Sequence, residues 1–343
     1  MCFVDYEKAF DRVNWVKLLK LLKRIGIDWR DRRLIATLYM GQTATVRLKD
    51  GLTNPAIIGR GTRQGCCLSP LLFNIYAEAM LREALDQVDE GIRVGGHLIK
   101  TVRYADDQAT VASSANGLQL MMDNMQETAR EYGMKINAKK TKVMKISKQP
   151  GEQLAVHLDG KPLSQVKRFC YLGSTLTQEG YCDVEIKTRI ARAKDAFSKR
   201  KELMTKSFSL ILKKRIIKAV VWSTLLYGSE SWTMRKDEIR RLESCEMWLW
   251  RKTLNIQWSD KVSNEEVLRR VGEERSLLDT IRRRQKTWLG HTIRHGDLLV
   301  IVMEGRIEGK RPPGRKRCGM MDQVKRQAGS YERVKRLSEN RFL

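Results

Sequence analysis

The chain has 343 residues, 42% of them hydrophobic, and its 66 Lys and Arg outnumber its 40 Asp and Glu, giving a formal net charge of +26 at pH 7. This composition can build packed cores and excludes a wholly disordered chain, and no run of about 18 apolar residues predicts a transmembrane helix. Residues 183–343 carry a net +18, against +8 for residues 1–182. Such an excess predicts a polyanionic partner, with nucleic acid favoured over an acidic membrane surface or a merely solvated charged face.

The first 180 residues predict an α+β fold, in which an antiparallel sheet is backed by helices at 14–25, 70–85 and 118–132. Asn14 is expected to cap the first helix and Gly26 to end it, while Pro70 stands at the first position of a later helix. The predicted helices cover 15–25, 31–40, 69–85 and 118–132. The predicted strands cover 2–6, 43–48, 56–58, 99–104, 108–112, 142–146 and 166–172.

Beyond residue 183 the pattern becomes helical and basic. Helices are expected over 184–206, 210–227, 236–254, 264–272 and 277–289, followed by an extended basic arm over 305–319. Clusters of Lys and Arg at 282–286 and 310–317 could contact phosphates without reading sequence, whereas Trp288 shares the spacing of a helix core.

Three carboxylates are the sharpest chemical feature. Asp106 and Asp107 are adjacent in a short turn between two predicted strands, and Asp5 lies inside an apolar run that a strand would bury. An Asp-Asp pair alone is common in surface turns, but a buried third carboxylate needs a partner or a metal. Mg²⁺ prefers such oxygen ligands, so we expect the three carboxyl groups to lie within about 6–8 Å of one another, as a two-metal site requires.

Five motifs resemble those of reverse transcriptases and occur in the same order. Their amino-acid sequences are similar to those of LINE-type, non-LTR retrotransposon polymerases. They are FVDYEKAFD at 3–11, GTRQGCCLSPLLFN at 61–74, YADD at 104–107, GMKINAKKTK at 133–142 and FCYLG at 169–173. Segments 225–232 and 288–291 also resemble the family's thumb and C-terminal region. The resemblance implies a polymerase palm over 1–180, an all-α thumb over 183–235 and a basic helical C-terminal region over 236–343.

The resemblance also implies an activity, RNA-directed DNA polymerisation by two-metal transfer from a dNTP to a primer 3′-OH. Two Mg²⁺ would be held by Asp5, Asp106 and Asp107. The implied partners are an RNA template, a DNA primer, dNTPs and a genomic DNA target, in an intracellular, nuclear setting without a membrane; no oligomeric state is implied. The implied substrate-side residues are Phe10, which would exclude a ribose 2′-OH, Arg63 near phosphate, Gln64 against the nucleotide, and Lys140, with Lys142 as a competitor, as the acid for pyrophosphate.

Each of these residues also has an ordinary structural interpretation. Phe10 could be a core side chain and either lysine a solvated one, and Cys66 and Cys67 are interpreted as packing residues. His291 and His295 are four residues apart, but no nearby cysteines complete a zinc motif, so no zinc site is expected.

The chain begins four residues before Asp5, where relatives place a fingers region and, further upstream, an endonuclease. The sequence is therefore interpreted as a fragment. The alternative function is a catalytically inactive remnant that binds nucleic acid through its basic C-terminal half.

Overall fold

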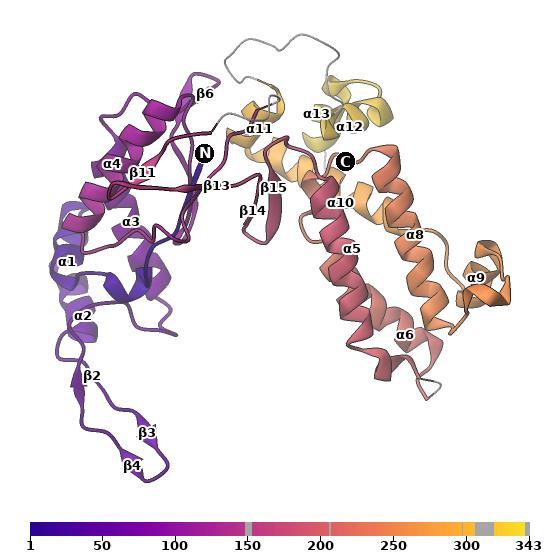
Figure 1. Cartoon of the computed structure of the whole chain (residues 1–343), viewed down its shortest axis with the longest axis horizontal. Helices are drawn as coiled ribbons and strands as arrows, with labels where there is room; N and C mark the ends of the chain where they lie inside the picture. Colours follow the sequence, from indigo (N-terminus) through magenta and orange to yellow (C-terminus); the bar gives the residue numbers. More distant parts are fainter. Residues whose placement is uncertain (148–152, 206, 297, 306–318, 340–343) are drawn as a thin grey trace. The chain divides into compact units, whose positions relative to one another are not determined.

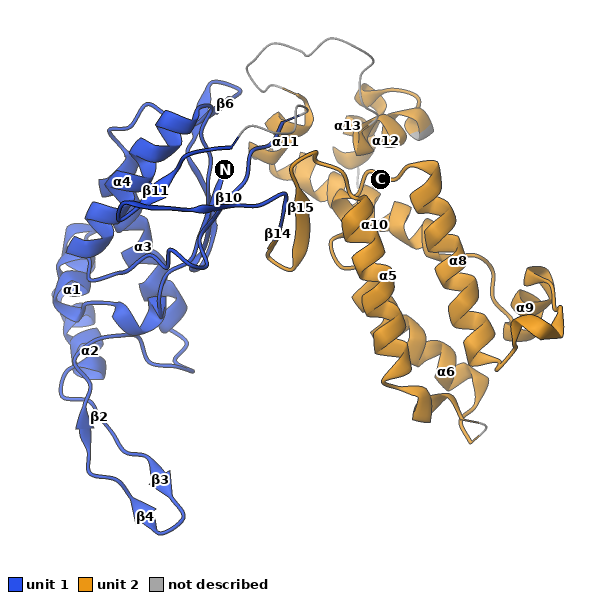
Figure 2. Ribbon diagram, viewed as in Figure 1, with its two compact units in different colours: residues 1–169 blue, residues 170–343 orange. Residues whose placement is uncertain are grey.

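The computed structural model describes residues 1–147, 153–205, 207–296, 298–305 and 319–339. The chain forms two compact units, Met1–Phe169 and Cys170–Leu343, which are coloured separately in Figure 2. Across the described ranges, no helix combines the length and hydrophobicity needed to cross a bilayer. The basic arm predicted over 305–319 falls, apart from its two end residues, outside the described residues.

A five-stranded sheet forms the centre of the first unit (Figure 1). Its order is β13-β10-β1-β9-β8, and β1 pairs antiparallel with both β9 and β10. The edge strand β13 runs parallel to β10, so the prediction of a purely antiparallel sheet is wrong at that edge. The strands are β1 (Cys2–Val4), β8 (Thr101–Tyr104), β9 (Asp107–Thr110), β10 (Lys142–Val143) and β13 (Ser164–Gln165).

Four helices accompany this sheet: α1 (Trp15–Arg24), α2 (Trp29–Tyr39), α3 (Ser69–Leu85) and α4 (Ala115–Glu131). Asn14 caps α1 as predicted, because its side chain accepts a hydrogen bond from the Lys17 amide at 3.0 Å. α2 and α4 begin earlier than predicted, since Asp28 and Ser114 act as their N-caps. Local capping chemistry therefore defines where these helices start.

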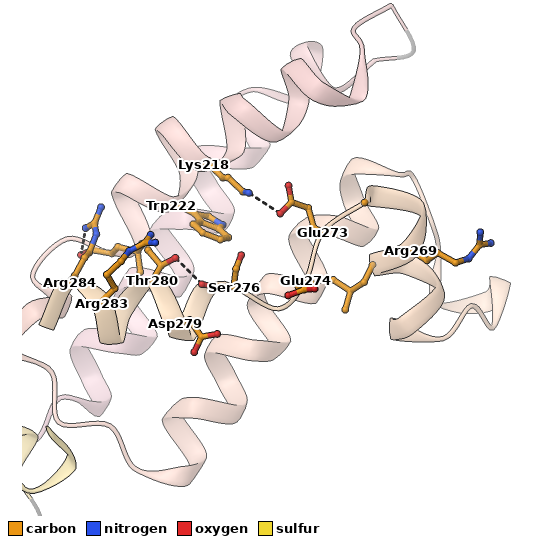
Figure 3. Close-up of a pocket in the computed structure, with 13 residues that line it drawn as sticks. Lys218, Trp222, Arg269, Glu273, Glu274, Ser276, Asp279, Thr280, Arg283 and Arg284 are labelled. Carbon is orange, nitrogen blue, oxygen red and sulfur yellow. Dashed lines mark hydrogen bonds and ion pairs between the residues drawn. The ribbon is translucent and has the colours of Figure 1, made fainter. Parts of the chain in front are cut away.

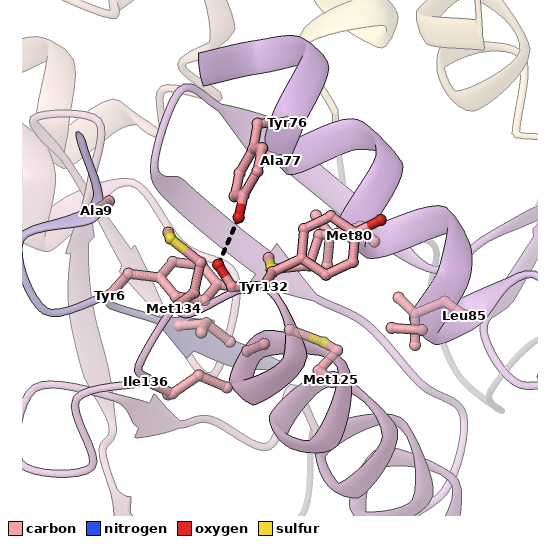
Figure 4. Close-up of a cluster of buried hydrophobic side chains, with 14 of the residues drawn as sticks. Tyr6, Ala9, Tyr76, Ala77, Met80, Leu85, Met125, Tyr132, Met134 and Ile136 are labelled. Atoms are coloured by element: carbon pink, nitrogen blue, oxygen red, sulfur yellow. Dashed lines mark hydrogen bonds between the residues drawn. The ribbon is translucent and has the colours of Figure 1, made fainter. Parts of the chain in front are cut away.

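The core of the first unit lies largely between α3 and α4 (Figure 4). Tyr76, Met80, Met125 and Tyr132 are all at most 1% exposed. The Tyr76 hydroxyl donates to the Tyr132 carbonyl, and burial raises the pKa of Tyr76 to about 12. Each such side chain contributes about 1.5–3 kcal/mol through removal from water, which holds the helices against the sheet.

Short hairpins replace several longer predicted strands. The predicted strand at 99–104 is divided between β7 and the central sheet, because a Gly95-Gly96 turn folds β7 back onto β6. The strand predicted at 142–146 shortens to β10, and that at 166–172 shortens to β14, which pairs with β15. The hairpin strands are β2 (Thr43–Ala44) with β5 (Ala56–Ile57), β3 (Arg47–Leu48) with β4 (Gly51–Leu52), β6 (Ile92–Val94) with β7 (His97–Ile99), β11 (His157–Leu158) with β12 (Lys161–Pro162), and β14 (Arg168–Tyr171) with β15 (Ser174–Thr177).

The second unit is helical, and its described residues contain no strand after β15. The helix predicted over 184–206 ends early, at Ser198, and the one predicted over 277–289 continues to His295. The segment predicted as one helix over 210–227 contains a π-helical turn, Ile217–Val221, between two α-helices. The α-helices are α5 (Asp183–Ser198), α6 (Leu210–Ile216), α7 (Trp222–Leu225), α8 (Lys236–Thr253), α9 (Asn264–Val271), α10 (Leu277–His295), α11 (Leu298–Met303), α12 (Met320–Ala328) and α13 (Tyr331–Glu339).

Buried carboxylates join elements of this second unit. Glu246 of α8 accepts hydrogen bonds from the amides of Ser276 and Leu277 at 3.0 and 3.1 Å, which attaches the start of α10 to α8. Glu185 of α5 pairs with Arg189 at 2.6 Å and also accepts the Thr175 amide of β15. These bonds order the helices around an apolar core.

Candidate active site

The register of the sheet brings Asp5 beside Asp107. Val4, the last residue of β1, pairs with Gln108 on β9, so Asp5, which follows β1 directly, lies next to Asp107, the first residue of β9. Tyr104 pairs with Asp107 across the β8–β9 hairpin, whose turn consists of Ala105 and Asp106, with Ala105 at φ 55°. The three predicted carboxylate residues therefore belong to one end of two neighbouring strands.

These carboxylates lie near enough to one another for their negative charges to interact unfavourably. Desolvation, then the charges of Asp106 and Asp5, raise the pKa of Asp107. One carboxylate oxygen of Asp5, Oδ2, is buried and has no hydrogen-bond donor among the described residues, and the Lys140 ammonium is 3.9 Å from it. An orphaned anionic oxygen within an all-oxygen donor set fits a hard divalent cation.

The side chains do not form a closed metal cage. Over the described ranges, no three His, Cys, Asp or Glu side chains are arranged closely enough to hold a metal ion. The predicted approach of Asp5, Asp106 and Asp107 to within 6–8 Å therefore stays a prediction.

The segment carrying Lys140 is attached to Asp5 through its backbone. The Asn137 amide donates to the Asp5 carbonyl at 2.7 Å, and the Asp5 amide donates to the Thr141 hydroxyl at 3.3 Å. The Asn137 side chain accepts from the amides of Lys139 and Lys140 at 3.1 and 3.3 Å, which forms the turn that carries Lys140.

The predicted competitor Lys142 is oriented differently, because its ammonium donates to the Lys139 carbonyl at 2.7 Å. Asn137 and Thr141 were missed as positioning residues in the sequence. The available signal was Asn137 two residues before a pair of lysines, since Asn side chains commonly form such turns.

Phe10 lies just after the sheet end and stacks on Phe73 of α3, with ring centroids 4.1 Å apart and planes 21° apart. Its carbonyl accepts the Thr62 amide at 2.8 Å. Gly61 is packed against Asp11: a Cβ at Gly61 would lie 2.9 Å from the Asp11 carbonyl oxygen. The loop that starts at Gly61 is thus bound to the segment that follows Asp5.

The remaining residues of this loop are largely exposed. Arg63 donates to the Leu38 carbonyl at 3.1 Å and Gln64 is exposed. Cys67 is also exposed, so its interpretation as a packing residue is wrong; the loop turns it outward ahead of α3. The pKa of Cys66 is lowered, chiefly by a hydrogen bond from the Leu68 amide.

The first residue of the FCYLG segment, Phe169, is the last residue of the first unit. Phe169 stacks on Phe3 of β1, with ring centroids 4.1 Å apart and planes 11° apart. This contact packs the last residue of the first unit against the strand that precedes Asp5.

Residues 1–176 match the family model described as reverse transcriptase (RNA-dependent DNA polymerase). Among curated proteins, the chain is 27% identical over 214 residues to a transposon-derived protein of Caenorhabditis elegans, covering 60% of this chain and 76% of that protein. It is 28% identical over 240 residues to the RNA-directed DNA polymerase from mobile element jockey of Drosophila melanogaster, covering 66% of this chain and 25% of the relative.

A longer match is 25% identical over 329 residues to the RNA-directed DNA polymerase from transposon X-element of Drosophila melanogaster, covering 91% of this chain. The chain spans 34% of that relative and 18% of a matching Drosophila melanogaster type-2 retrotransposable element polyprotein. Among solved structures, apo telomerase from Candida tropicalis aligns over 90% of this chain and 52% of its own, with 11% identity and a TM-score of 0.41. That structural likeness is too weak to carry an argument.

Proposed function

Because residues 1–176 make this chain a member of the reverse transcriptase family, with non-LTR retrotransposon polymerases among its relatives, we propose that it copies RNA into DNA. The observation that carries this proposal is the position of Asp5 beside Asp107 at the β8–β9 hairpin, with Asp106 in its turn. In this proposal residues 1–180 are the palm, 183–235 the thumb and 236–343 a basic nucleic-acid-binding region.

Asp5, Asp106 and Asp107 would hold two Mg²⁺. Bound there, the ions would supply the positive charge that favours attack of a primer 3′-OH on the α-phosphate of a dNTP. The chain's own contribution is to hold these carboxylates close together. A divalent cation bound there would neutralise the unpaired Asp5 oxygen and relieve the charge repulsion at Asp107. Proton transfer to the leaving pyrophosphate is assigned to Lys140, whose ammonium lies beside Asp5, rather than to Lys142.

Sugar selection is assigned to Phe10, which the Phe73 ring holds in place. A rigid ring beside the nucleotide leaves no space for a 2′-OH. Arg63 and Gln64, exposed in the neighbouring loop, would contact the triphosphate and base. The template would be RNA, the primer a strand of genomic DNA, and the site of action the nucleus; the basic second unit supports binding to these polyanions.

Primer extension on an RNA template with Mg²⁺ and dNTPs tests the proposal. The double substitution Asp106→Asn and Asp107→Asn should abolish extension, because neutral amides hold divalent ions poorly. It should leave RNA binding unchanged or slightly tighter, since negative charge is removed. A matched control, Asp86→Asn with Asp89→Asn, removes the same charge from exposed positions and should extend normally.

Extension that survives the double substitution would refute the catalytic assignment. An unmodified chain that binds RNA but never extends a primer would instead support the binding remnant. In an active chain, Lys140→Ala should slow extension about 10²-fold or more while Lys142→Ala changes it little. Phe10→Val should admit ribonucleotides; if it does not, Phe10 is an ordinary packing residue.

A further inference from the structure

A buried hydrogen bond connects the immediate neighbours of Asp5 and Asp107. The Tyr6 hydroxyl donates to Oε1 of Gln108 at 3.2 Å, and the two residues are 8% and 2% exposed. Tyr6 follows Asp5 directly, and Gln108 follows Asp107 directly. The bond therefore joins the neighbours of two carboxylates that the proposed function uses, although neither Tyr6 nor Gln108 has a part in that function so far.

The bond lies on the opposite face of the sheet from the two carboxylates. Successive side chains of a strand point to opposite faces of its sheet. The register pairs Val4 with Gln108, so Tyr6 and Gln108 share one face while Asp5 and Asp107 share the other. The first face is buried, and the second carries the exposed Asp107. The hydrogen bond is thus placed directly behind the candidate active site.

The bond belongs to a buried polar network that reaches α4. Nε2 of Gln108 donates to the Thr110 hydroxyl at 3.1 Å, and both groups lie 3.6 Å from the sulfur of Met125 on α4. The Tyr6 ring packs in the same core (Figure 4), and its backbone forms an antiparallel bridge with Ile136. Because each side-chain polar atom of the network has a partner, the network can hold one arrangement.

The backbone pairing of the two strands stops short of the carboxylates. The β1–β9 ladder ends one residue before Asp5 and Asp107. Asp5 is bound through its backbone to residues 137 and 141, whereas Asp107 belongs to the β8–β9 hairpin. The bond from Tyr6 to Gln108 crosses between these two halves of the site at the end of the ladder. A shear or twist of one strand against the other, which would change the separation of the carboxyl groups, would stretch this bond.

We propose that Tyr6 and Gln108 are positioning residues that set the separation of Asp5 and Asp107, and thereby the affinity of the site for divalent cations. The inference rests on the proposed function, because it concerns the same metal site. Neither side chain would contact an ion or a nucleotide, since both are buried on the reverse face. Mg²⁺ demands near-ideal octahedral geometry, so a small displacement of one carboxylate weakens its binding.

The test measures Mn²⁺ binding to the full chain by electron paramagnetic resonance, without nucleic acid or dNTPs. Mn²⁺ takes the same kinds of oxygen ligand as Mg²⁺ and is detected directly. Binding that remains in the double variant Asp106→Asn, Asp107→Asn is subtracted, so that only the candidate site is counted. Tyr6→Phe and Gln108→Leu should each weaken the remaining binding about tenfold, the lower end of the effect of residues that orient metal ligands.

Two comparisons separate positioning from stability. Tyr76→Phe removes another buried hydroxyl, which donates to the Tyr132 carbonyl in the same core, so it should lower the Tm as Tyr6→Phe does but leave the Mn²⁺ affinity unchanged. The double variant Tyr6→Phe, Gln108→Leu leaves neither partner of the bond buried and unpaired, so its Tm should recover toward that of the unmodified chain. Its Mn²⁺ affinity should stay about tenfold weaker, because the strands still lack the connection.

The inference is overturned if Mn²⁺ affinity follows the Tm across these variants, because the bond would then be merely structural. Mn²⁺ binding that is unchanged in the Tyr6 and Gln108 variants refutes the positioning role alone and leaves the proposed function intact. If the unmodified chain binds no more Mn²⁺ than the Asp106→Asn, Asp107→Asn variant, the proposed metal site fails, and this inference fails with it. Where a single variant does not fold, the double variant Tyr6→Phe, Gln108→Leu provides the measurement.

Discussion

Replacing Gly61 by alanine should destabilise the first unit and the loop that faces the candidate active site. Gly61 has a φ of +96°, and a Cβ there would lie 2.9, 3.0 and 3.1 Å from the carbonyl oxygen, Cα and carbonyl carbon of Asp11. All three atoms are backbone, so they cannot rotate away as a flexible side chain would.

The expected magnitude has two parts. An L-residue at positive φ costs about 1–2 kcal/mol. Forcing a methyl group into a packed position adds about 1–3 kcal/mol. Gly65, in the same loop, separates the parts: its φ is +81°, but nothing lies within 4 Å of the point that a Cβ would occupy there. Gly65→Ala should therefore lose about 1–2 kcal/mol and Gly61→Ala about 2–5 kcal/mol.

Urea unfolding followed by circular dichroism measures the global loss, and amide hydrogen exchange measures the local one. The Gly61 and Thr62 amides donate to Val13 and Phe10 carbonyls at 2.8 Å each, so their protection should fall in Gly61→Ala. Equal losses for the two alanine variants would refute the reasoning, because only the contact with Asp11 distinguishes them.

Two further perturbations follow from charges in each unit. Arg189→Met should destabilise the second unit by about 3–5 kcal/mol, because it leaves the buried carboxylate of Glu185 without its cation. Lys187→Met breaks only an exposed ion pair and should cost about 0–1 kcal/mol. Comparable losses of unfolding free energy for the two variants in urea would contradict this reasoning. The folded-state pKa of Asp107 is raised by desolvation and by its two neighbouring carboxylates, so its ionisation weakens the fold as pH rises through that pKa. In EDTA, Asp107→Asn should therefore raise the Tm near pH 7, and the gain should vanish below the ordinary Asp pKa of about 3.9; a gain that persists at low pH would exclude this cause.

Local sequence patterns were enough to predict several helix boundaries, the protein family and the helical character of the second half. Asn14 marks the start of α1, because capping acts within a few residues, and Pro70 stands in the first turn of α3, at its second position and not, as predicted, at its first. The motifs at 3–11 and 104–107 identified the reverse transcriptase family, since both are contiguous strings. The helical character of the second half also follows from periodicity alone.

Only the tertiary structure determines how the residues of these motifs are arranged relative to one another. Only the β1–β9 register places Asp5 beside Asp107, and only the turn at Asn137 places Lys140 rather than Lys142 near it. The parallel edge strand, the π-helical turn before Trp222 and the cavity of about 840 Å³ that Trp222 lines (Figure 3) have no local signature. They arise from pairing and packing between residues far apart in the chain, where the burial of a partner, and not the neighbouring sequence, sets the free energy of each contact.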